Sequence, residues 1–383
     1  MARTLLMAAA LLVTACAGNV TAPRPPAQAP QPPPVSSIPA MQATRVALLL
    51  PLSGTNAALG QAMLDAAQMA LFDHAGDGFE LMPRDTKGTP QGAADAARQA
   101  ISEGARLILG PVFAADVAAV RPIAQNAGVD VLAFTNDWTQ AGNGTYVLGF
   151  VPADQVTRVV GFARSRGITR FVALAPRSPY GDAVVNALQT AAGRFGGQIA
   201  QVERYDPNTT DFTAAARQVT QSPVQPQAVM LAEGGQRVKA LATALAAGGV
   251  DTQRVRLLGT GLWDEPGLGQ EPALVGAWFA AAAPEQRADV EARFERLYGK
   301  KPPRVATLAY DATALAAILA RMGGPMPYTP ATLSNPSGFE GVDGLFRLRP
   351  DGLSERALAV LEVTPTGTRV IDPAARTFEA LGQ

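Results

Sequence analysis

Cysteine and histidine are almost missing from this sequence, and their scarcity excludes several kinds of chemistry. One cysteine, Cys16, and one histidine, His74, occur among 383 residues. An internal disulfide needs two cysteines, and a Ser-His-Asp triad would have to use His74. A transition-metal site would have to be built from carboxylates. We therefore expect no metal, no cofactor and no catalysis, and we expect His74 to be a surface or helix-end residue.

Net charge and aromatic residues are also low. The 32 acidic residues balance the 32 basic residues, and aromatics make up 6% of the chain. A nucleic-acid surface needs clustered Lys and Arg, and no such run occurs. No Gly-x-Ser-x-Gly elbow, Walker loop or His-Glu-x-x-His pattern is present either. The sequence thus indicates no nucleic-acid partner and gives no support to an enzyme.

Long apolar runs are missing as well. The first apolar stretch, residues 5–13, is shorter than the roughly 20 residues that a membrane-spanning helix needs. It follows Met1-Ala2-Arg3 and ends in Leu12-Val13-Thr14-Ala15-Cys16, which resembles a bacterial lipoprotein signal. The resemblance implies that residues 1–15 are removed and that Cys16 carries a lipid anchor. The alternative is an ordinary cleaved signal with a chance cysteine or a buried thiol.

The residue after Cys16 indicates which membrane would hold the lipid anchor. Inner-membrane lipoproteins of Gram-negative cells often carry Asp there, whereas this chain has Ala17. The resemblance thus implies the periplasmic face of the envelope and favours the outer membrane over the inner one.

A segment rich in Pro, Ala and Gln follows, over residues 16–43. Proline fixes φ and removes amide donors, so this composition favours extended polyproline II at about 3.1 Å per residue. We interpret the segment as a tether that lets the folded part reach several nanometres from the bilayer. A passive spacer is the alternative.

Residues 44–383 are long enough for two lobes. Short apolar runs alternate with helical patterns, which is typical of doubly wound α/β architecture with parallel sheets. Near-continuous apolar strands also predict helices on both faces of each sheet. The expected strands are residues 46–50, 79–82, 107–109, 129–134, 171–174, 199–205, 228–231 and 255–258.

An ordered series of short motifs runs through these residues. The pieces are Leu50-Pro51-Leu52-Ser53-Gly54, Ile108-Leu109-Gly110-Pro111, Val131-Leu132-Ala133-Phe134, Ser178-Pro179-Tyr180-Gly181, Gly196-Gly197, Tyr310-Asp311-Ala312 and Phe339-Glu340-Gly341-Val342-Asp343-Gly344. The series resembles the type I periplasmic binding proteins of the leucine/isoleucine/valine-binding class. It implies two α/β lobes, residues 44–150 plus 284–330 and residues 151–283 plus 331–383, joined by three crossovers at a hinge. We interpret Asp311 as a fold-supporting residue near that hinge.

Ligands of open α/β sheets bind at the carboxyl ends of the strands. The candidate cleft residues are Ser53, Asn56, Ala114, Ala115, Thr135, Asn136, Asp137, Tyr180, Glu233 and Trp263. In amino-acid-binding members of the family, hydroxyls and amides hold the ligand carboxylate, and an acidic group of the second lobe meets its ammonium. Here Ala114 and Ala115 offer no hydroxyl. Asp137 stands near the position where members of the family usually have Thr, and its carboxylate would repel a ligand carboxylate by about 1 kcal/mol. For Tyr180 and Trp263, the alternative to lining the cleft is a role in packing.

A narrower resemblance covers the anchor, the tether and the fold together. With Gly110-Pro111 and Phe134-Thr135-Asn136-Asp137, they resemble the lipoprotein activators of penicillin-binding proteins, although the helical-repeat domain of the enterobacterial activators is missing. This resemblance implies a non-catalytic partner of a peptidoglycan synthase. The alternative is the solute-binding subunit of an ABC importer, with an amino acid or small polar ligand and a permease as partners.

Overall fold

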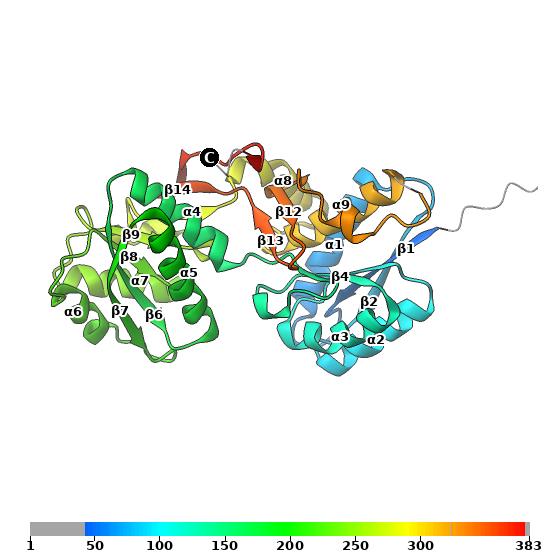
Figure 1. Cartoon of the computed structure of the whole chain (residues 1–383), viewed down its shortest axis with the longest axis horizontal. Helices are drawn as coiled ribbons and strands as arrows, with labels where there is room; N and C mark the ends of the chain where they lie inside the picture. Colours follow the sequence, from blue (N-terminus) through cyan, green and yellow to red (C-terminus); the bar gives the residue numbers. More distant parts are fainter. Residues whose placement is uncertain (1–42, 323, 380–383) are drawn as a thin grey trace, which may run out of the picture. The chain divides into compact units, whose positions relative to one another are not determined.

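The structure is a computed structural model that describes residues 43–322 and 324–379 (Figure 1). The predicted signal, Cys16 and the tether through residue 42 lie outside these ranges. The chain divides after Met41, and everything below belongs to the unit that follows. Within the described ranges, no helix combines the length and the hydropathy that a membrane crossing requires.

The first sheet has five parallel strands in the order β2-β1-β3-β4-β5. Its strands and the helices that follow them are β1 (Thr44–Leu50), α1 (Ala57–His74), β2 (Phe79–Asp85), α2 (Pro90–Ser102), β3 (Leu107–Leu109), α3 (Ala114–Ala127), β4 (Asp130–Ala133), the 3-10 helix η1 (Trp138–Gln140) and β5 (Thr145–Val147). Alternate residues of β1 face opposite ways: Leu48 packs with α1, and Leu49 packs with α2 and α3. Helices therefore cover both faces of this sheet, as predicted.

The second sheet has seven strands in the order β15-β14-β10-β9-β8-β6-β7. The elements are α4 (Pro152–Ser165), β6 (Arg170–Pro176), α5 (Pro179–Phe195), β7 (Gln198–Tyr205), α6 (Thr213–Thr220), β8 (Ala228–Leu231), α7 (Gly235–Ala247), β9 (Arg256–Gly259), η2 (Gly261–Trp263), η3 (Leu268–Gln270), η4 (Pro272–Leu274), β10 (Trp278–Ala281), β14 (Ala359–Thr364) and β15 (Gly367–Asp372). Strands β6 to β10 pair in parallel, while β14 and β15 add an antiparallel edge. The helices α4 and α5 cover one face, and α6 and α7 cover the other.

A small antiparallel sheet, β11-β12-β13, completes the molecule. This part contains α8 (Pro284–Tyr298), α9 (Ala306–Met322), α10 (Pro330–Leu333), β11 (Phe339–Gly341), β12 (Gly344–Leu348) and β13 (Ser354–Arg356). Leu333, Phe346 and Leu348 are buried in the same core as β1 and α1. Residues 331–356, which we expected in the second lobe, thus pack against the first sheet. We use "first lobe" for the first sheet with α1–α3, α8–α10 and β11–β13, and "second lobe" for the second sheet with α4–α7.

The chain crosses between the lobes three times, before α4, before α8 and before β14. A buried charge cluster lies at these crossovers. Arg304 Nη2 lies 2.8 Å from Asp343 Oδ1, and Asp311 Oδ1 accepts a 2.7 Å hydrogen bond from the Val342 amide. The Arg356 guanidinium stacks on the Phe150 ring at 5.0 Å and lies 4.0 Å from Asp311 Oδ2. Asp311 is 2% exposed, and its contacts with Val342 and Arg356 support the fold of the first lobe beside the crossovers.

Candidate functional site

The loops at the carboxyl ends of β1 to β4 form what we call the first rim, residues 51–56, 86–89, 110–113 and 134–137. Asp85, the last residue of β2, organises it. Its Oδ1 accepts backbone hydrogen bonds from Leu52 at 2.9 Å, Ser53 at 3.2 Å and Lys87 at 2.7 Å. Burial opposes ionisation of Asp85, but hydrogen bonds from Ser53 and the amides outweigh it and lower its pKa. Ser53 itself remains exposed on this loop.

Two helices begin on the first rim without a side-chain cap. The N-cap residue of α1 is Asn56 and that of α3 is Phe113, and neither side chain bonds to the helix amides. The first amides of a helix have no partner inside it and carry partial positive charge. Ala114 and Ala115 can therefore contribute to an anion site through their backbone N–H groups, although their side chains are apolar.

Thr135 and Asp137 hold the fourth loop of the first rim together. Thr135 is 5% exposed, and its Oγ1 accepts a 3.1 Å hydrogen bond from the Asp137 amide. Asp137 Oδ1 accepts from the Thr139 amide at 3.0 Å and from its hydroxyl at 2.7 Å, so it caps η1. Asn136 between them is exposed. The Asp137 carboxylate is thus held by neutral donors of its own loop, which fix its orientation.

The loops at the carboxyl ends of β6, β8 and β9 form the second rim, residues 177–180, 232–235 and 260–262. Tyr180 is partly buried there, and its hydroxyl lies 2.7 Å from Thr260 Oγ1. Burial raises the pKa of Tyr180 to about 12, so the phenol stays neutral and available as a hydrogen-bonding group. The contact with Thr260 orders the start of α5 beside the end of β9.

Glu233 is committed to an internal network. It is 8% exposed, and its Oε1 accepts hydrogen bonds of 2.9 Å from the Tyr205 hydroxyl and from Arg237 Nη2. Arg237, four residues after Glu233 in the chain, thereby neutralises the carboxylate. Burial together with the Glu233 charge raises the pKa of Tyr205, which fixes its hydroxyl as a donor. Glu233 therefore stabilises the second rim internally, and Arg237 balances its charge.

Trp263 does not face a ligand. Its side chain is fully buried, and its indole Nε1 donates a 2.8 Å hydrogen bond to the Glu233 carbonyl. The ring lies directly on Gly259, where an added Cβ would come within 2.2 Å of ring atoms. We expected Trp263 as a cleft candidate, and the structure instead makes it part of the core. The exposed apolar residue of this loop is its neighbour Leu262, which is 45% exposed.

The start of α7 adds a third helix terminus without a side-chain cap. Its N-cap residue is Gly234, which cannot cap with a side chain, and Leu262 packs against it. Sequence reasoning missed Asp85, Tyr205, Arg237, Thr260 and Leu262. A signal existed for Arg237, because Glu233 and Arg237 have the spacing of a helical ion pair. Within the described residues, no group of three or more His, Cys, Asp and Glu is placed to hold a metal ion.

Both rims thus offer backbone amides and apolar surface; Asp137 and Glu233 are hydrogen-bonded internally, whereas Lys87 and Arg177 are exposed on the two rims. A family model described as periplasmic binding protein matches residues 43–368. No curated protein matches the chain.

Solved structures share the fold. The structure of a putative branched-chain amino acid ABC transporter from Rhodospirillum rubrum has 22% identity and a TM-score of 0.76, over 86% of this chain and 100% of that one. An ABC transporter substrate-binding protein from Sphaerobacter thermophilus has 20% identity and a TM-score of 0.72, over 87% and 98%. A solute-binding protein from R. palustris in complex with benzoate has 19% identity and a TM-score of 0.63, over 88% and 97%. These similarities confirm the predicted two-lobed α/β architecture.

Proposed function

Because the chain belongs to the periplasmic binding protein family, we propose that it is the solute-binding component of an ABC importer and works in the periplasm. The observation that carries this proposal is the set of three helices, α1, α3 and α7, that begin on the rims without side-chain caps. The Ala57 amide of α1 bonds to the Gly54 carbonyl, and the remaining first-turn amides of the three helices suit a carboxylate or another small anion. The proposed ligand lies between the two rims.

The ligand we propose is a carboxylate without a neighbouring ammonium group. Glu233, the acidic residue expected to meet an ammonium, is neutralised by Arg237 and bonded to Tyr205. The exposed Leu262 and the half-buried Phe113 supply apolar surface on the two rims for the body of such a molecule. The benzoate complex of the R. palustris protein is an example of a ligand of this chemistry on the same fold.

Thermal unfolding of the purified protein tests the proposal. A ligand present at about 100 times its Kd stabilises the folded state by about 2.7 kcal/mol. We expect benzoate or an aliphatic monocarboxylate to raise the melting temperature, and benzamide and leucine to leave it unchanged. A shift with leucine equal to that with carboxylates would contradict the ligand class.

A matched pair of variants on α3 locates the site. Ala115 and Ala118 are both exposed on this helix, but only Ala115 lies in its first turn. Ala115→Asp places a carboxylate against the proposed anion site, and an acidic residue in a first turn is compatible with the helix. We expect Ala115→Asp to abolish the ligand-induced shift and Ala118→Asp to preserve it.

A second candidate function is favoured by the N-terminal sequence. The apolar start, Cys16 and the Pro-rich residues that follow suit a lipid-anchored protein that reaches a partner, and we propose a penicillin-binding protein as that partner. Outer-membrane anchoring belongs to this second proposal. Cys16→Ser should move the protein from the membrane fraction to the soluble fraction. In this reading Ala115→Asp leaves capture of the purified synthase unchanged, whereas loss of capture would tie that partner to the rims.

A further inference from the structure

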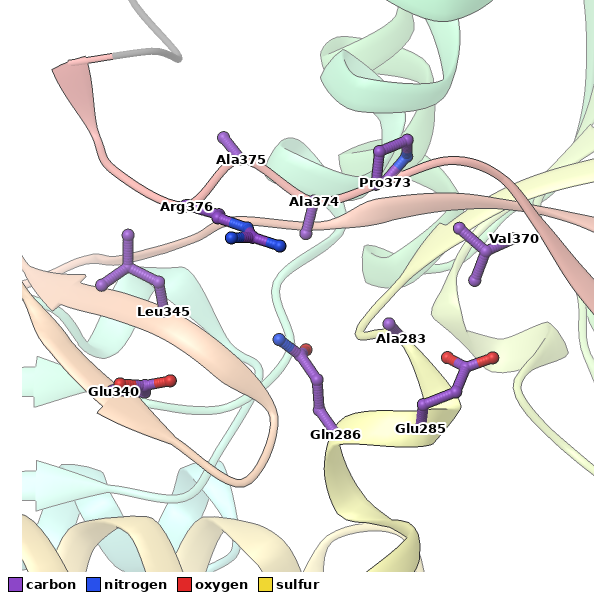
Figure 2. A pocket seen from close by; sticks show the side chains of 10 residues that line it. All are labelled: Ala283, Glu285, Gln286, Glu340, Leu345, Val370, Pro373, Ala374, Ala375 and Arg376. Carbon is purple, nitrogen blue, oxygen red and sulfur yellow. The ribbon is translucent and has the colours of Figure 1, made fainter.

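A cavity of about 690 Å³ lies at the crossovers, and no residue of either rim lines it (Figure 2). Three segments form it: the start of α8, the hairpin of β11 and β12, and β15 with the chain that follows it. Its lining residues are Ala283, Glu285, Gln286, Glu340, Leu345, Val370, Pro373, Ala374, Ala375 and Arg376. None of the candidate cleft residues is among them.

The chain after β15 forms a strap over this cavity, residues 373–379. β15 is an edge strand of the second sheet. At the other end of the strap, Phe378 is 6% exposed, and the Arg347 guanidinium of β12 stacks on its ring at 4.3 Å. The strap therefore leaves the second lobe and is fastened to the first lobe, so that the cavity beneath it is walled by both.

The charged side chains that line the cavity are not paired with each other. Within the described ranges, no hydrogen bond or ion pair occupies the side chains of Glu285, Gln286, Glu340 and Arg376. Figure 2 shows Arg376 on the strap, on the opposite side of the cavity from Glu340 and from Glu285 of α8. Opposite charges that line one cavity without direct contact leave both signs available to a ligand between them.

The rest of the lining limits the ligand further. Ala283, Ala374 and Ala375 are small, and Leu345 and Val370 are apolar, so the wall between the charges suits a short methylene chain. Two carboxylates against one guanidinium leave a local charge of −1, which favours a ligand with one more positive group than negative groups. The volume fits a molecule of amino-acid or dipeptide size.

We propose that this cavity is a second ligand site and that it binds a basic amino acid or a short basic peptide. The ammonium groups lie against Glu285 and Glu340, and the ligand carboxylate lies against Arg376. This site goes beyond the proposed function, because it shares no residue with the rims and takes a ligand of opposite charge.

Calorimetric titration with L-lysine and with cadaverine, which has no carboxylate, tests the assignment. We expect both to bind, with lysine the tighter. The double variant Glu285→Gln, Glu340→Gln should weaken both at least about tenfold, whereas Arg376→Gln should weaken lysine alone. Glu295→Gln is the matched control, because Glu295 is exposed on the same helix α8 but lies outside the cavity. It should change neither affinity.

Three results would overturn the proposal. The first is no saturable binding of lysine or cadaverine up to about 10 mM, the weak limit for a specific small-ligand site. The second is lysine binding that survives the double glutamate variant. The third is lysine binding that Ala115→Asp abolishes, which would assign the ligand to the rims. The four cavity side chains are exposed and unpaired, so these variants should keep the wild-type melting temperature.

Discussion

Asp264 and Arg304 form an ion pair across the crossovers, with Oδ2 and Nε 2.9 Å apart. Asp264 follows η2 of the second lobe, and Arg304 precedes α9 of the first. Asp264 Oδ1 also lies 2.7 Å from Arg287 Nη2, and Arg304 forms a second ion pair with Asp343. The side chains of Asp264 and Arg287 are 8% and 9% exposed, so water contributes little to their solvation. The two lobes are thus joined by buried charges as well as by three chain segments.

Asp264→Asn should be destabilising. It removes the carboxylate that Arg287 and Arg304 share, while Arg287 keeps Glu291 and Arg304 keeps Asp343. The expected cost is that of lost charge-assisted hydrogen bonds, about 1.5–3 kcal/mol. The free energy of unfolding in urea measures the loss. Asp95→Asn is the control, because Asp95 pairs with Arg98 in an exposed contact, which is worth about 0–1 kcal/mol. Equal losses in the two variants would show that the Asp264 pairs are not buried in solution.

The contribution of Asp154 to stability should fall as pH rises. Burial, followed by the negative charge of Glu355, raises the pKa of this carboxyl from 3.8 to about 7. The folded chain thus holds the proton more tightly than the unfolded chain, so the contribution is complete below the unfolded pKa and is lost as pH rises through about 7. Asp154→Asn cannot ionise and keeps an oxygen for the Arg356 amide.

The measurement compares urea unfolding of wild type and Asp154→Asn at about pH 5 and about pH 8. The variant should gain stability relative to wild type at the higher pH. A difference that is the same at both pH values would mean that Asp154 has an ordinary pKa.

Replacing Trp263 and replacing Trp138 by alanine should change stability by different amounts. Trp263 is fully buried, so Trp263→Ala should cost about 3–5 kcal/mol through the cavity it leaves. Trp138 is 36% exposed, and Trp138→Ala should cost less than about 1 kcal/mol. Urea unfolding followed by circular dichroism checks both. Trp263→Phe, which refills part of the space, should recover part of the loss.

Glu233→Gln should reduce stability without abolishing ligand binding. The amide can still accept one hydrogen bond, but the charge-assisted contact with Arg237 is lost, at a cost of about 1.5–3 kcal/mol. Tyr205→Phe is the matched variant, because it removes the other contact and no charge. A Glu233→Gln protein with wild-type stability and no carboxylate binding would place Glu233 in contact with the ligand.

Much of the fold was predictable because it rests on local patterns. The apolar run from Val46 to Leu50 became the interior strand β1, between β2 and β3 and buried on both faces. β5, with only three residues, and the antiparallel strands β14 and β15 were not predicted. The three residues of β5 are too few to show a periodic pattern. The local sequence of β14 and β15 does not indicate which sheet they join or at which edge.

The sequence places the candidate cleft residues near strand ends, but it does not give their roles. The loops after β1, β4 and β8 carry Ser53, Thr135 and Glu233, and Ala114 is the first residue of α3, which follows the loop after β3. The sequence does not show that Thr135 bonds to its own loop or that Tyr205 bonds to Glu233. Such contacts join residues through space, so they decide which polar groups remain free for a ligand.

The α/β class and the helices on both sheet faces could be predicted from the sequence, because hydrophobic periodicity is local and burial follows from it. The packing of residues 331–356 on the first lobe and the pairing of Asp264 with Arg304 were set by the tertiary structure. It also decided that Trp263 lies in the core and that Glu285 and Arg376 line one cavity. Each of these depends on segments distant in the chain, whose meeting is set by the packing of whole sheets.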